Sequence, residues 1–276
     1  MNQTPHILMC PPTHFGVEYV INPWMEGNVG GADPSEAARQ WDDLYRLISD
    51  RTQVALVEPA EGLPDMCFVA NAGLRLDGCF VPSVFRVPQR AAEVPHFIRW
   101  FTEAGDRIKT IPEDRAFEGE GDALFHPGRA LLWAGYGVRS ALLSHRDLRR
   151  LFRIEVASLR LTDERFYHLD TCFCPLPDGA AMYHPAAFDD RSLKLIHRIV
   201  PEDRRIEVSE EDALGFCCNA VRIGRTLIAH HGSAELKKQL ARLDFELITT
   251  PLDQFLKAGG GAKCLTLLLS QDLKAP

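Results

Sequence analysis

The chain has 276 residues, of which 46% are hydrophobic and 25% are charged. These are ordinary values for a globular protein, and they exclude a largely disordered, collagen-like or low-complexity chain. The 31 Lys and Arg residues against 38 Asp and Glu residues give a formal net charge of −7. This balance argues against a broad surface for nucleic acid or an anionic membrane, but not against a small cationic ligand.

Short apolar runs and amphipathic stretches alternate from one end of the chain to the other. The apolar runs predict strands at residues 7–9, 54–57, 67–70, 130–134, 154–159, 226–229, 245–248 and 264–269. The amphipathic stretches predict helices at residues 33–49, 95–104, 145–152, 191–199, 234–243 and 252–257. The helix at 33–49 has the clearest start signal, because Asp33 is an N-cap residue, Pro34 follows it, and Glu36 completes a capping-box pattern.

No long Gly/Ser linker and no block of like charge interrupts this alternation. We therefore expect a single α/β domain over residues 1–276. Five strand-rich units with one helix each, at about 55 residues per unit, would fit the length.

Eight cysteines are present, and none has C-x-x-C or zinc-finger spacing. The pairs Cys172/Cys174 and Cys217/Cys218 are too close together for ordinary disulfides. The N-terminal stretch carries no signal-peptide pattern, and no run approaches the ~20 apolar residues of a membrane span. We expect a soluble, cytoplasmic protein whose thiols are mostly free and buried.

Cys264 has the most unusual surroundings of the eight thiols. It follows a triple glycine, 259–261, which lets the backbone approach a ligand closely, and it follows Lys263, whose charge would favour a thiolate. A glycine turn that enters a buried final strand is the alternative, with Cys264 as apolar filler. Cys218 ranks lower as a nucleophile because nothing basic or glycine-rich surrounds it.

His168 and Asp170 are two residues apart in an apolar segment. On a strand they would point to the same face, where an imidazole beside a carboxylate could transfer protons next to a cationic substrate. A His–Asp pair that only stabilises the strand explains the spacing equally well.

Glu118, Glu120 and Asp122 are spaced by glycines and form an acidic loop. Such a loop can recognise a cation, bind a metal, or be a solvated turn, and no further ligand spacing supports the metal. The adjacent His230 and His231 could also bind a metal, but we interpret them as a loop feature.

Asn71 follows the apolar run 67–70 at an expected strand end, a place where sites are often built. A turn asparagine is the commoner explanation for such a residue.

Three motifs stand out together: Glu-Gly-x-Gly-Asp at 118–122, His-Leu-Asp-Thr at 168–171 and Gly-Gly-Gly-x-x-Cys at 259–264. They resemble the guanidine-modifying (pentein) superfamily of arginine deiminases, dimethylarginine dimethylaminohydrolases and amidinotransferases. Within it the chain is most similar to the arginine dihydrolase domain. That similarity covers essentially the whole chain, and it is carried by the stretches 9–12, 19–28, 68–73, 133–137, 163–175 and 255–260.

The resemblance implies a fold and a set of site residues. The fold would be a five-bladed, pseudo-symmetric α/β propeller of ββαβ units around a central site, in agreement with the five-unit estimate. The implied roles are Cys264 as nucleophile, His168 as general acid/base, Glu118 and Asp170 as guanidinium ligands, Asn22, Arg90 and Arg139 as ligands of the α-amino and α-carboxylate groups, and the Ala258 carbonyl as a further acceptor.

The implied reaction is the hydrolysis of L-arginine to L-ornithine, CO2 and two ammonia through a covalent thiouronium on Cys264, with no metal or organic cofactor. Arginine deiminases carry an aspartate where this chain has Asn71, and they stop at citrulline. The amide of Asn71 can donate to a urea-type oxygen, which a carboxylate cannot do, and this favours a second hydrolysis.

Other activities on the same scaffold are an arginine deiminase or dimethylarginine dimethylaminohydrolase that stops at citrulline and, less favoured, an amidinotransferase. A non-catalytic pentein-fold binding module is the alternative from a different class. The joint presence of Cys264, His168 and Glu118 and the negative net charge oppose it. The expected partner is a small guanidino substrate rather than nucleic acid or membrane, and the resemblance is compatible with a homo-oligomer. Some dihydrolases carry a C-terminal domain resembling ornithine cyclodeaminase, and we expect that activity to be absent here.

Overall fold

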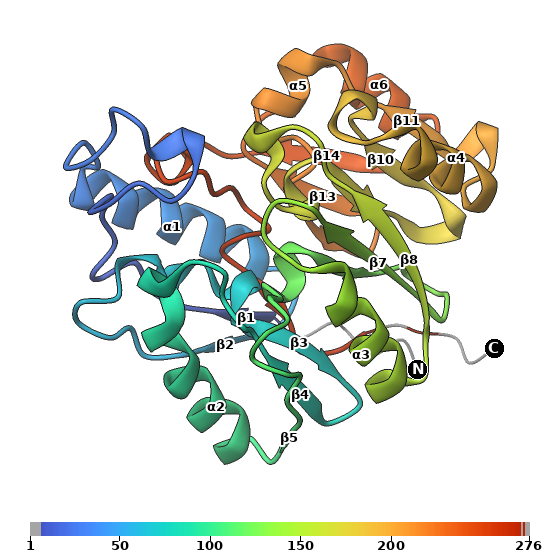
Figure 1. The fold of residues 1–276 in the computed structure, drawn as a ribbon. Coiled ribbons are helices and arrows are strands. Elements are labelled where there is room, and N and C mark those ends of the chain that lie inside the picture. The colour runs from blue at the N-terminus through green and yellow to red at the C-terminus, as the bar shows by residue number, and fades with distance from the viewer. Residues whose placement is uncertain (1–6, 272, 274–276) are drawn as a thin grey trace.

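The computed structural model describes residues 7–271 and 273, and Figure 1 shows strands gathered at the centre with helices around them. The strands are β1 (Ile7–Met9), β2 (Val54–Leu56), β3 (Gly73–Leu76), β4 (Cys79–Pro82), β5 (Arg107–Ile108), β6 (Ala123–Phe125), β7 (Leu131–Tyr136), β8 (Glu155–Arg160), β9 (Phe173–Pro175), β10 (Ala181–Tyr183), β11 (Arg205–Glu207), β12 (Val221–Ile223), β13 (Thr226–Ala229), β14 (Glu246–Thr249) and β15 (Leu267–Leu268). The helices are α1 (Pro34–Ser49), α2 (Val94–Glu103), α3 (Leu142–Phe152), α4 (Asp190–Ile199), α5 (Glu210–Leu214), α6 (Ala234–Ala241) and α7 (Asp253–Leu256). The single-domain prediction for residues 1–276 extends at both ends beyond the described residues.

The strands form five three-stranded sheets that share one topology. In each sheet a first strand pairs antiparallel with a second, and the second pairs parallel with a third, as in β6–β7–β8. A parallel neighbour requires a crossover connection, and a helix supplies it in every unit, as α3 does between β7 and β8. This repetition confirms the predicted five-bladed α/β propeller of ββαβ units.

The fifth sheet joins the two ends of the described chain. Its first strand is β15, which pairs antiparallel with β1 at Ile7 and Leu268, and β1 then pairs parallel with β2 across α1. The propeller is therefore closed by strands that are far apart in the sequence.

All six predicted helices are present with slightly different ends, and α5 was not predicted. The side chain of Asp33 caps α1 as expected, by accepting hydrogen bonds from the backbone N–H groups of Ser35 and Glu36. The reciprocal half of the capping box is wrong: the Asp33 N–H donates to Gln254, and Glu36 pairs with Arg39 instead. No helix in the described part of the chain is long and apolar enough to cross a bilayer.

Two strand predictions fail at the centre of the molecule. Residues 67–70 span parts of two short 3-10 turns, Pro64–Cys67 and Val69–Ala72, and of the run 264–269 only Leu267–Leu268 is paired. These segments are apolar because they are buried near the propeller axis, and burial alone does not distinguish a strand from a turn. Strands of two to four residues such as β5, β9 and β12 were missed because so short a run carries almost no periodic signal.

A tight turn precedes the first strand of every sheet, and the five turns form a closed ring. They are Val69–Ala72, Gly119–Gly121, Leu169–Thr171 and residues 216–219 and 261–264.

Successive turns are joined by hydrogen bonds around the whole ring. The bonds run from Asn71 Nδ2 to Glu118 O, from Leu169 N to Asp122 Oδ1, from Asn219 Nδ2 to Asp170 O, from Cys264 N to Asn219 Oδ1 and from Ala70 N to Cys264 O. The ring places side chains from all five units at the axis.

Candidate functional site

A small cavity opens at the ring of turns. It is lined by seven of the residues singled out from the sequence: Asn22, Asn71, Arg90, Arg139, His168, Ala258 and Cys264. The other two, Glu118 and Asp170, are buried and hydrogen bonded to His168 and Cys264 respectively. The structure therefore brings all nine together.

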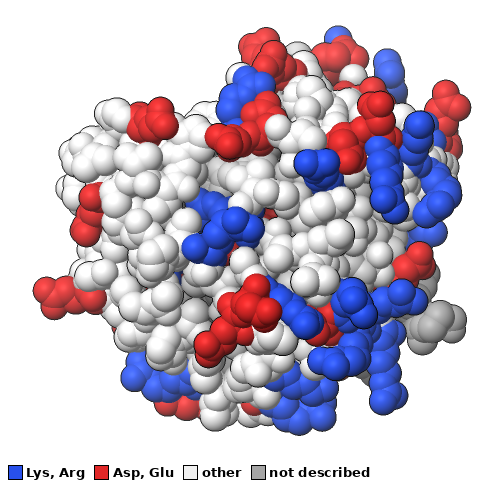
Figure 2. All heavy atoms as spheres, viewed as in Figure 1, with Lys and Arg blue, Asp and Glu red and all other residues white. Residues whose placement is uncertain are grey.

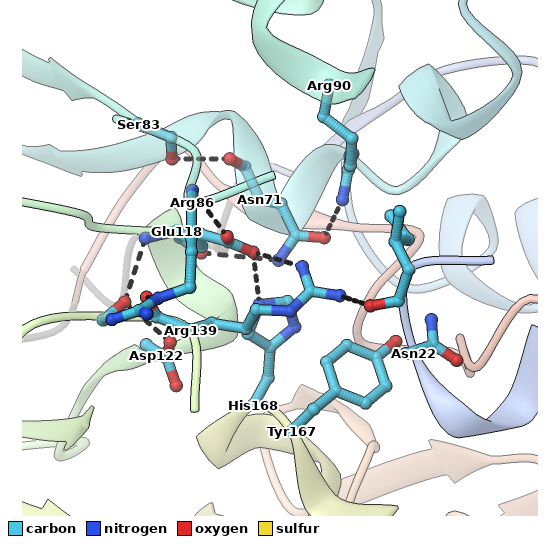
Figure 3. Close-up of polar contacts among 12 residues, drawn as sticks. Asn22, Asn71, Ser83, Arg86, Arg90, Glu118, Asp122, Arg139, Tyr167 and His168 are labelled. Atoms are coloured by element: carbon cyan, nitrogen blue, oxygen red, sulfur yellow. Dashed lines mark hydrogen bonds and ion pairs between the residues drawn. The ribbon is translucent and has the colours of Figure 1, made fainter. Parts of the chain in front are cut away.

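Glu118 is completely buried and surrounded by donors (Figure 3). Its Oε2 accepts from His168 Nε2 at 2.7 Å and from Arg139 Nη1 at 3.0 Å, and its Oε1 accepts from the backbone N–H of Arg86 at 3.1 Å. Burial raises the pKa of Glu118, but the hydrogen bond and charge of His168 and the charges of Arg139 and Arg90 outweigh it and lower the pKa to about 2. The site therefore contains a carboxylate that stays ionised.

His168 contacts Glu118 and not Asp170. It caps the short turn Leu169–Thr171 rather than lying on a strand, so the predicted same-face pair with Asp170 is wrong. Its Nε2 is held by Glu118, while its Nδ1 has no hydrogen-bond partner within the described chain. The imidazole is thus fixed at one nitrogen only.

Asp170 lies beside the sulfur of Cys264, with Oδ2 at 3.5 Å from Sγ. Burial raises the pKa of Asp170 to about 6, against the opposing charges of His168 and Lys263. Burial and the Asp170 charge together raise the pKa of the Cys264 thiol well above its usual value. A cation that binds between them would reverse both effects.

The charge of Lys263 lowers the pKa of the Cys264 thiol, as expected, but the Lys263 side chain bonds to other groups. Its Nζ donates to Glu120 Oε2 at 2.8 Å and to the Thr266 carbonyl, in a buried ion pair. Adjacent residues in this turn therefore have different hydrogen-bond partners, and Lys263 acts on the thiol through its charge and not through a hydrogen bond.

The acidic loop is not a solvated turn, because Glu118, Glu120 and Asp122 are all buried. Asp122 accepts from Ser140 Oγ at 2.6 Å and from the Leu169 N–H at 3.0 Å, and so connects two turns of the ring. Gly119 has φ +60°, and a Cβ there would lie 2.5 Å from the Ala70 carbonyl oxygen, so the close approach of these turns requires glycine.

No group of three or more His, Cys, Asp or Glu side chains that could hold a metal exists among residues 7–271 and 273. His230 accepts a hydrogen bond from the Leu252 N–H at Nδ1, in accord with its interpretation as a loop feature.

Asn71 and Arg90 contact each other at 2.6 Å, through Asn71 Oδ1 and Arg90 Nη1. Glu93 holds Arg90 with two bonds of 2.8 Å, and Arg90 Nη2 also donates to the Asp65 carbonyl. Asn71 Nδ2 donates to the Glu118 carbonyl at 3.3 Å. The Asn71 amide and the Arg90 guanidinium are therefore held in place by Glu93 and by backbone carbonyl groups.

Asn22, Ala258 and Arg139 also line the cavity. Asn22 Nδ2 donates to the Ala258 carbonyl at 3.0 Å, and Arg139 Nη2 donates to the Ile21 carbonyl. The Arg139 guanidinium lies 5.0 Å from the centre of the Tyr167 ring, in a cation–π contact.

Three residues of the site were not singled out from the sequence: Asp65, Tyr167 and Asn219. Asp65 lines the cavity, and its buried Oδ1 has no partner within the described residues, while Oδ2 accepts from Tyr19. Tyr167 donates to the Gly259 carbonyl at 2.6 Å, and Asn219 donates to Cys264 Sγ at 3.1 Å. A sequence signal could have found Asn219. An aromatic residue stands three positions before a polar residue in four of the turns, at Asn71, Glu120, Asp170 and Asn219.

Acidic and basic side chains are interspersed over the face shown in Figure 2, and basic side chains gather over and around α3. The last turn of α3 carries Arg149 and Arg150.

No family model matches the chain. The chain is 50% identical over 267 residues to the bifunctional arginine dihydrolase/ornithine cyclodeaminase ArgZ of Synechocystis sp.. The aligned residues make up 97% of this chain and 38% of ArgZ. It is 35% identical over 266 residues to N(G),N(G)-dimethylarginine dimethylaminohydrolase of Mycobacterium tuberculosis, and this alignment includes 96% of the chain and 86% of that protein. The chain thus spans less than half of ArgZ but most of the second relative.

Solved structures of the N-terminal domain of ArgZ match the chain closely. The N71S variant, covalently bound to a reaction intermediate, has a TM-score of 0.96 and 49% identity, over 98% of this chain and 100% of that one. The C264S variant, bound to substrate, also has a TM-score of 0.96 and 49% identity, over 97% and 98%.

Proposed function

The chain belongs to the guanidine-modifying (pentein) superfamily, together with the arginine dihydrolase domain of ArgZ, and we propose that it hydrolyses L-arginine to L-ornithine, CO2 and two ammonia. The proposed catalytic domain is residues 1–276, and the proposed nucleophile is Cys264. The observation that carries the proposal is the arrangement at the ring: a thiol beside Asp170, and an ionised Glu118 bonded to His168.

A guanidinium is a planar cation whose N–H groups pair with carboxylates. Glu118 already accepts the guanidinium of Arg139, so its environment suits this chemistry. A substrate guanidinium bound between Glu118 and Asp170 would place its central carbon near Cys264 Sγ. Its charge would lower the pKa of the thiol at the moment of binding.

The first half of the reaction forms a covalent intermediate. The thiol proton passes to His168, the thiolate adds to the guanidinium carbon, and the C=N electron pair moves onto nitrogen. His168 then gives its proton to the departing nitrogen, and ammonia leaves as the C–N bond breaks. A thiouronium remains on Cys264.

The second half of the reaction releases the product from Cys264. His168 takes a proton from water as the water oxygen adds to the thiouronium carbon, and the C–S bond breaks with its electron pair on sulfur. This yields a citrulline-like ureido compound and regenerates the thiolate. A second hydrolysis of the ureido carbon, using another water, gives L-ornithine, CO2 and the second ammonia.

The amino-acid end of the substrate would lie at the mouth of the cavity. The unpaired, buried oxygen of Asp65 and the Ala258 carbonyl, held by Asn22, suit the α-ammonium group. Arg90 retains one N–H of Nη1 beyond its bond to Asn71, and this N–H suits the α-carboxylate. The role proposed for Arg139 requires its guanidinium to turn from Glu118 toward the carboxylate. Such anchoring would lower the entropic part of the barrier.

Asn71 would decide how far the reaction proceeds. Its amide can donate to the oxygen of a ureido intermediate, whereas a carboxylate at this position would only accept. The ArgZ domain structures support these assignments, since they include a variant of Asn71 with a covalent intermediate and a variant of Cys264 with substrate. This chain also has an asparagine at position 71 and a cysteine at position 264.

The product ratio from L-arginine tests the proposal. Mass spectrometry with an ammonia assay should find ornithine and two ammonia per arginine consumed. Citrulline and one ammonia would instead favour a deiminase, the second candidate. Asn71→Asp should shift the product toward citrulline, and an undiminished rate of ornithine release by that variant would remove the role proposed for Asn71.

A cytoplasmic location is also part of the proposal, because all eight cysteines are free and buried. Rapid alkylation in freshly lysed, denatured cells should label all eight thiols, and a protected pair would contradict it.

A further inference from the structure

One turn of the ring has no function in the mechanism above. Four turns carry the proposed machinery: Asn71, Glu118, the pair His168 and Asp170, and Cys264. The remaining turn, residues 216–219, precedes β12 and contributes Asn219, whose side chain is fully buried at the axis.

Three hydrogen bonds fix the Asn219 side chain. Its Oδ1 accepts from the Cys264 backbone N–H at 3.1 Å, and its Nδ2 donates to the Asp170 carbonyl at 3.3 Å and to Cys264 Sγ at 3.1 Å. Because a backbone N–H can only donate, the amide oxygen must face Cys264 N. The NH2 group must therefore face the sulfur.

The surrounding backbone is built to admit this amide. Asn219 O also accepts from the Lys263 N–H, so the turn is attached to the Cys264 segment at two backbone positions. A Cβ on Gly261 would lie 2.8 Å from Asn219 Oδ1, closer than real Cβ contacts come. The third glycine before Cys264 thus leaves room for the amide.

The sulfur has few other sources of stabilisation. Burial and Asp170 both disfavour the thiolate, Lys263 is paired with Glu120, and His168 is bonded to Glu118. Three groups lower the pKa of this thiol: the backbone N–H of Gly261, the Asn219 amide, which lies 3.1 Å from Sγ, and the more distant charge of Lys263. A neutral donor at 3.1 Å stabilises an anionic sulfur more than a neutral one.

We propose that Asn219 is a catalytic residue that donates a hydrogen bond to Cys264 Sγ and stabilises the thiolate. The inference rests on the proposed function. The Asn219 N–H bonds the sulfur before the C–S bond forms, and again when that bond breaks and its electron pair returns to sulfur. Asn219 itself gains and loses no proton.

Asn219→Ser tests this, since a serine hydroxyl is too short to reach Sγ. We expect kcat to fall about 100-fold with little change in KM, the size of effect seen when one donor to a developing anion is removed. We also expect the pH profile for inactivation of Cys264 by iodoacetamide and by 2-chloroacetamidine to move to higher pH. Asn219→Asp should show the same shift, because a carboxylate at this place repels the thiolate.

The thiol profile separates this inference from the proposed function, because it is measured without arginine turnover. Ser192→Ala is the matched control: it removes a buried hydroxyl that accepts from the Arg160 N–H, away from the ring. It should lower stability and leave the thiol profile unchanged. Unchanged profiles and kcat in folded Asn219 variants would overturn the proposal. Failure of both variants to fold would overturn it as well, in favour of a purely structural role.

Discussion

Glu118 and Glu120 are separated by one residue in the same turn, and both carboxylates are buried, yet their partners differ in kind. Glu118 accepts from His168 and Arg139, two side chains that line the cavity. Glu120 pairs with Lys263, which does not line that cavity, and it also accepts from the Leu268 N–H. Burial of charge alone therefore does not mark a catalytic group.

The two carboxylates differ in whether a substrate can replace their basic partner. Arg139 can turn away from Glu118 because its guanidinium lies at the cavity, so a substrate guanidinium can take its place. Lys263 cannot leave Glu120 without depriving an almost wholly buried carboxylate of its counter-charge. We expect the first glutamate to determine activity and the second to determine stability.

Glu118→Gln should give the largest effect. It keeps the size of the side chain but removes the charge that orients the guanidinium and supports His168, so kcat should fall by about 10³-fold or more. Steady-state ornithine release measures it, with circular dichroism to verify the fold. Near wild-type turnover by Glu118→Gln would contradict the catalytic role of Glu118.

Glu120→Gln should mainly affect stability. It leaves Lys263 buried without a counter-charge, which costs about 3–5 kcal/mol, and urea unfolding measures this. The double variant Glu120→Gln, Lys263→Met should recover most of the loss because no buried charge remains. If Glu120→Gln instead lowered kcat as much as Glu118→Gln at full stability, the two carboxylates would not be distinct.

The pH dependence should follow Asp170. With its pKa raised to about 6, Asp170 takes up a proton as the pH falls through 6 and can no longer pair with a guanidinium. We expect kcat/KM to fall about tenfold for each pH unit below 6, whereas Glu118, with its pKa near 2, adds no further loss there. A profile that stays flat down to pH 5 would contradict this.

Asp33→Ala should give the smallest effect and serves as a comparison outside the ring. It removes the N-cap of α1 and should destabilise the protein by about 1 kcal/mol, with kcat unchanged. A thermal melt measures the loss, and a change in kcat would show that α1 is coupled to the cavity.

The outer parts of the propeller could be predicted from the sequence. Helices α1 to α4 carry amphipathic patterns long enough to register, and strands such as β8 and β13 form clear apolar runs. The family resemblance supplied the five-unit closure, since β1 and β15 pair across the whole length of the chain.

The inner turns could not be predicted, because both faces of such a segment are buried and periodicity disappears. The run 67–70 was mistaken for a strand for this reason. The sequence also does not show which side chains form hydrogen bonds with each other. Lys263 adjoins Cys264 in sequence but bonds Glu120, and Asn219 bonds the Cys264 sulfur from 45 residues away in the chain. Only the three-dimensional ring shows which side chains meet.

Covalent catalysis by Cys264 can be tested by quenching turnover of L-arginine in acid and measuring the intact mass of the protein, followed by peptide mapping. We expect an adduct of arginine less one ammonia on Cys264, and no adduct and no turnover in Cys264→Ala. Turnover that persists in Cys264→Ala, or an adduct on another residue, would contradict it.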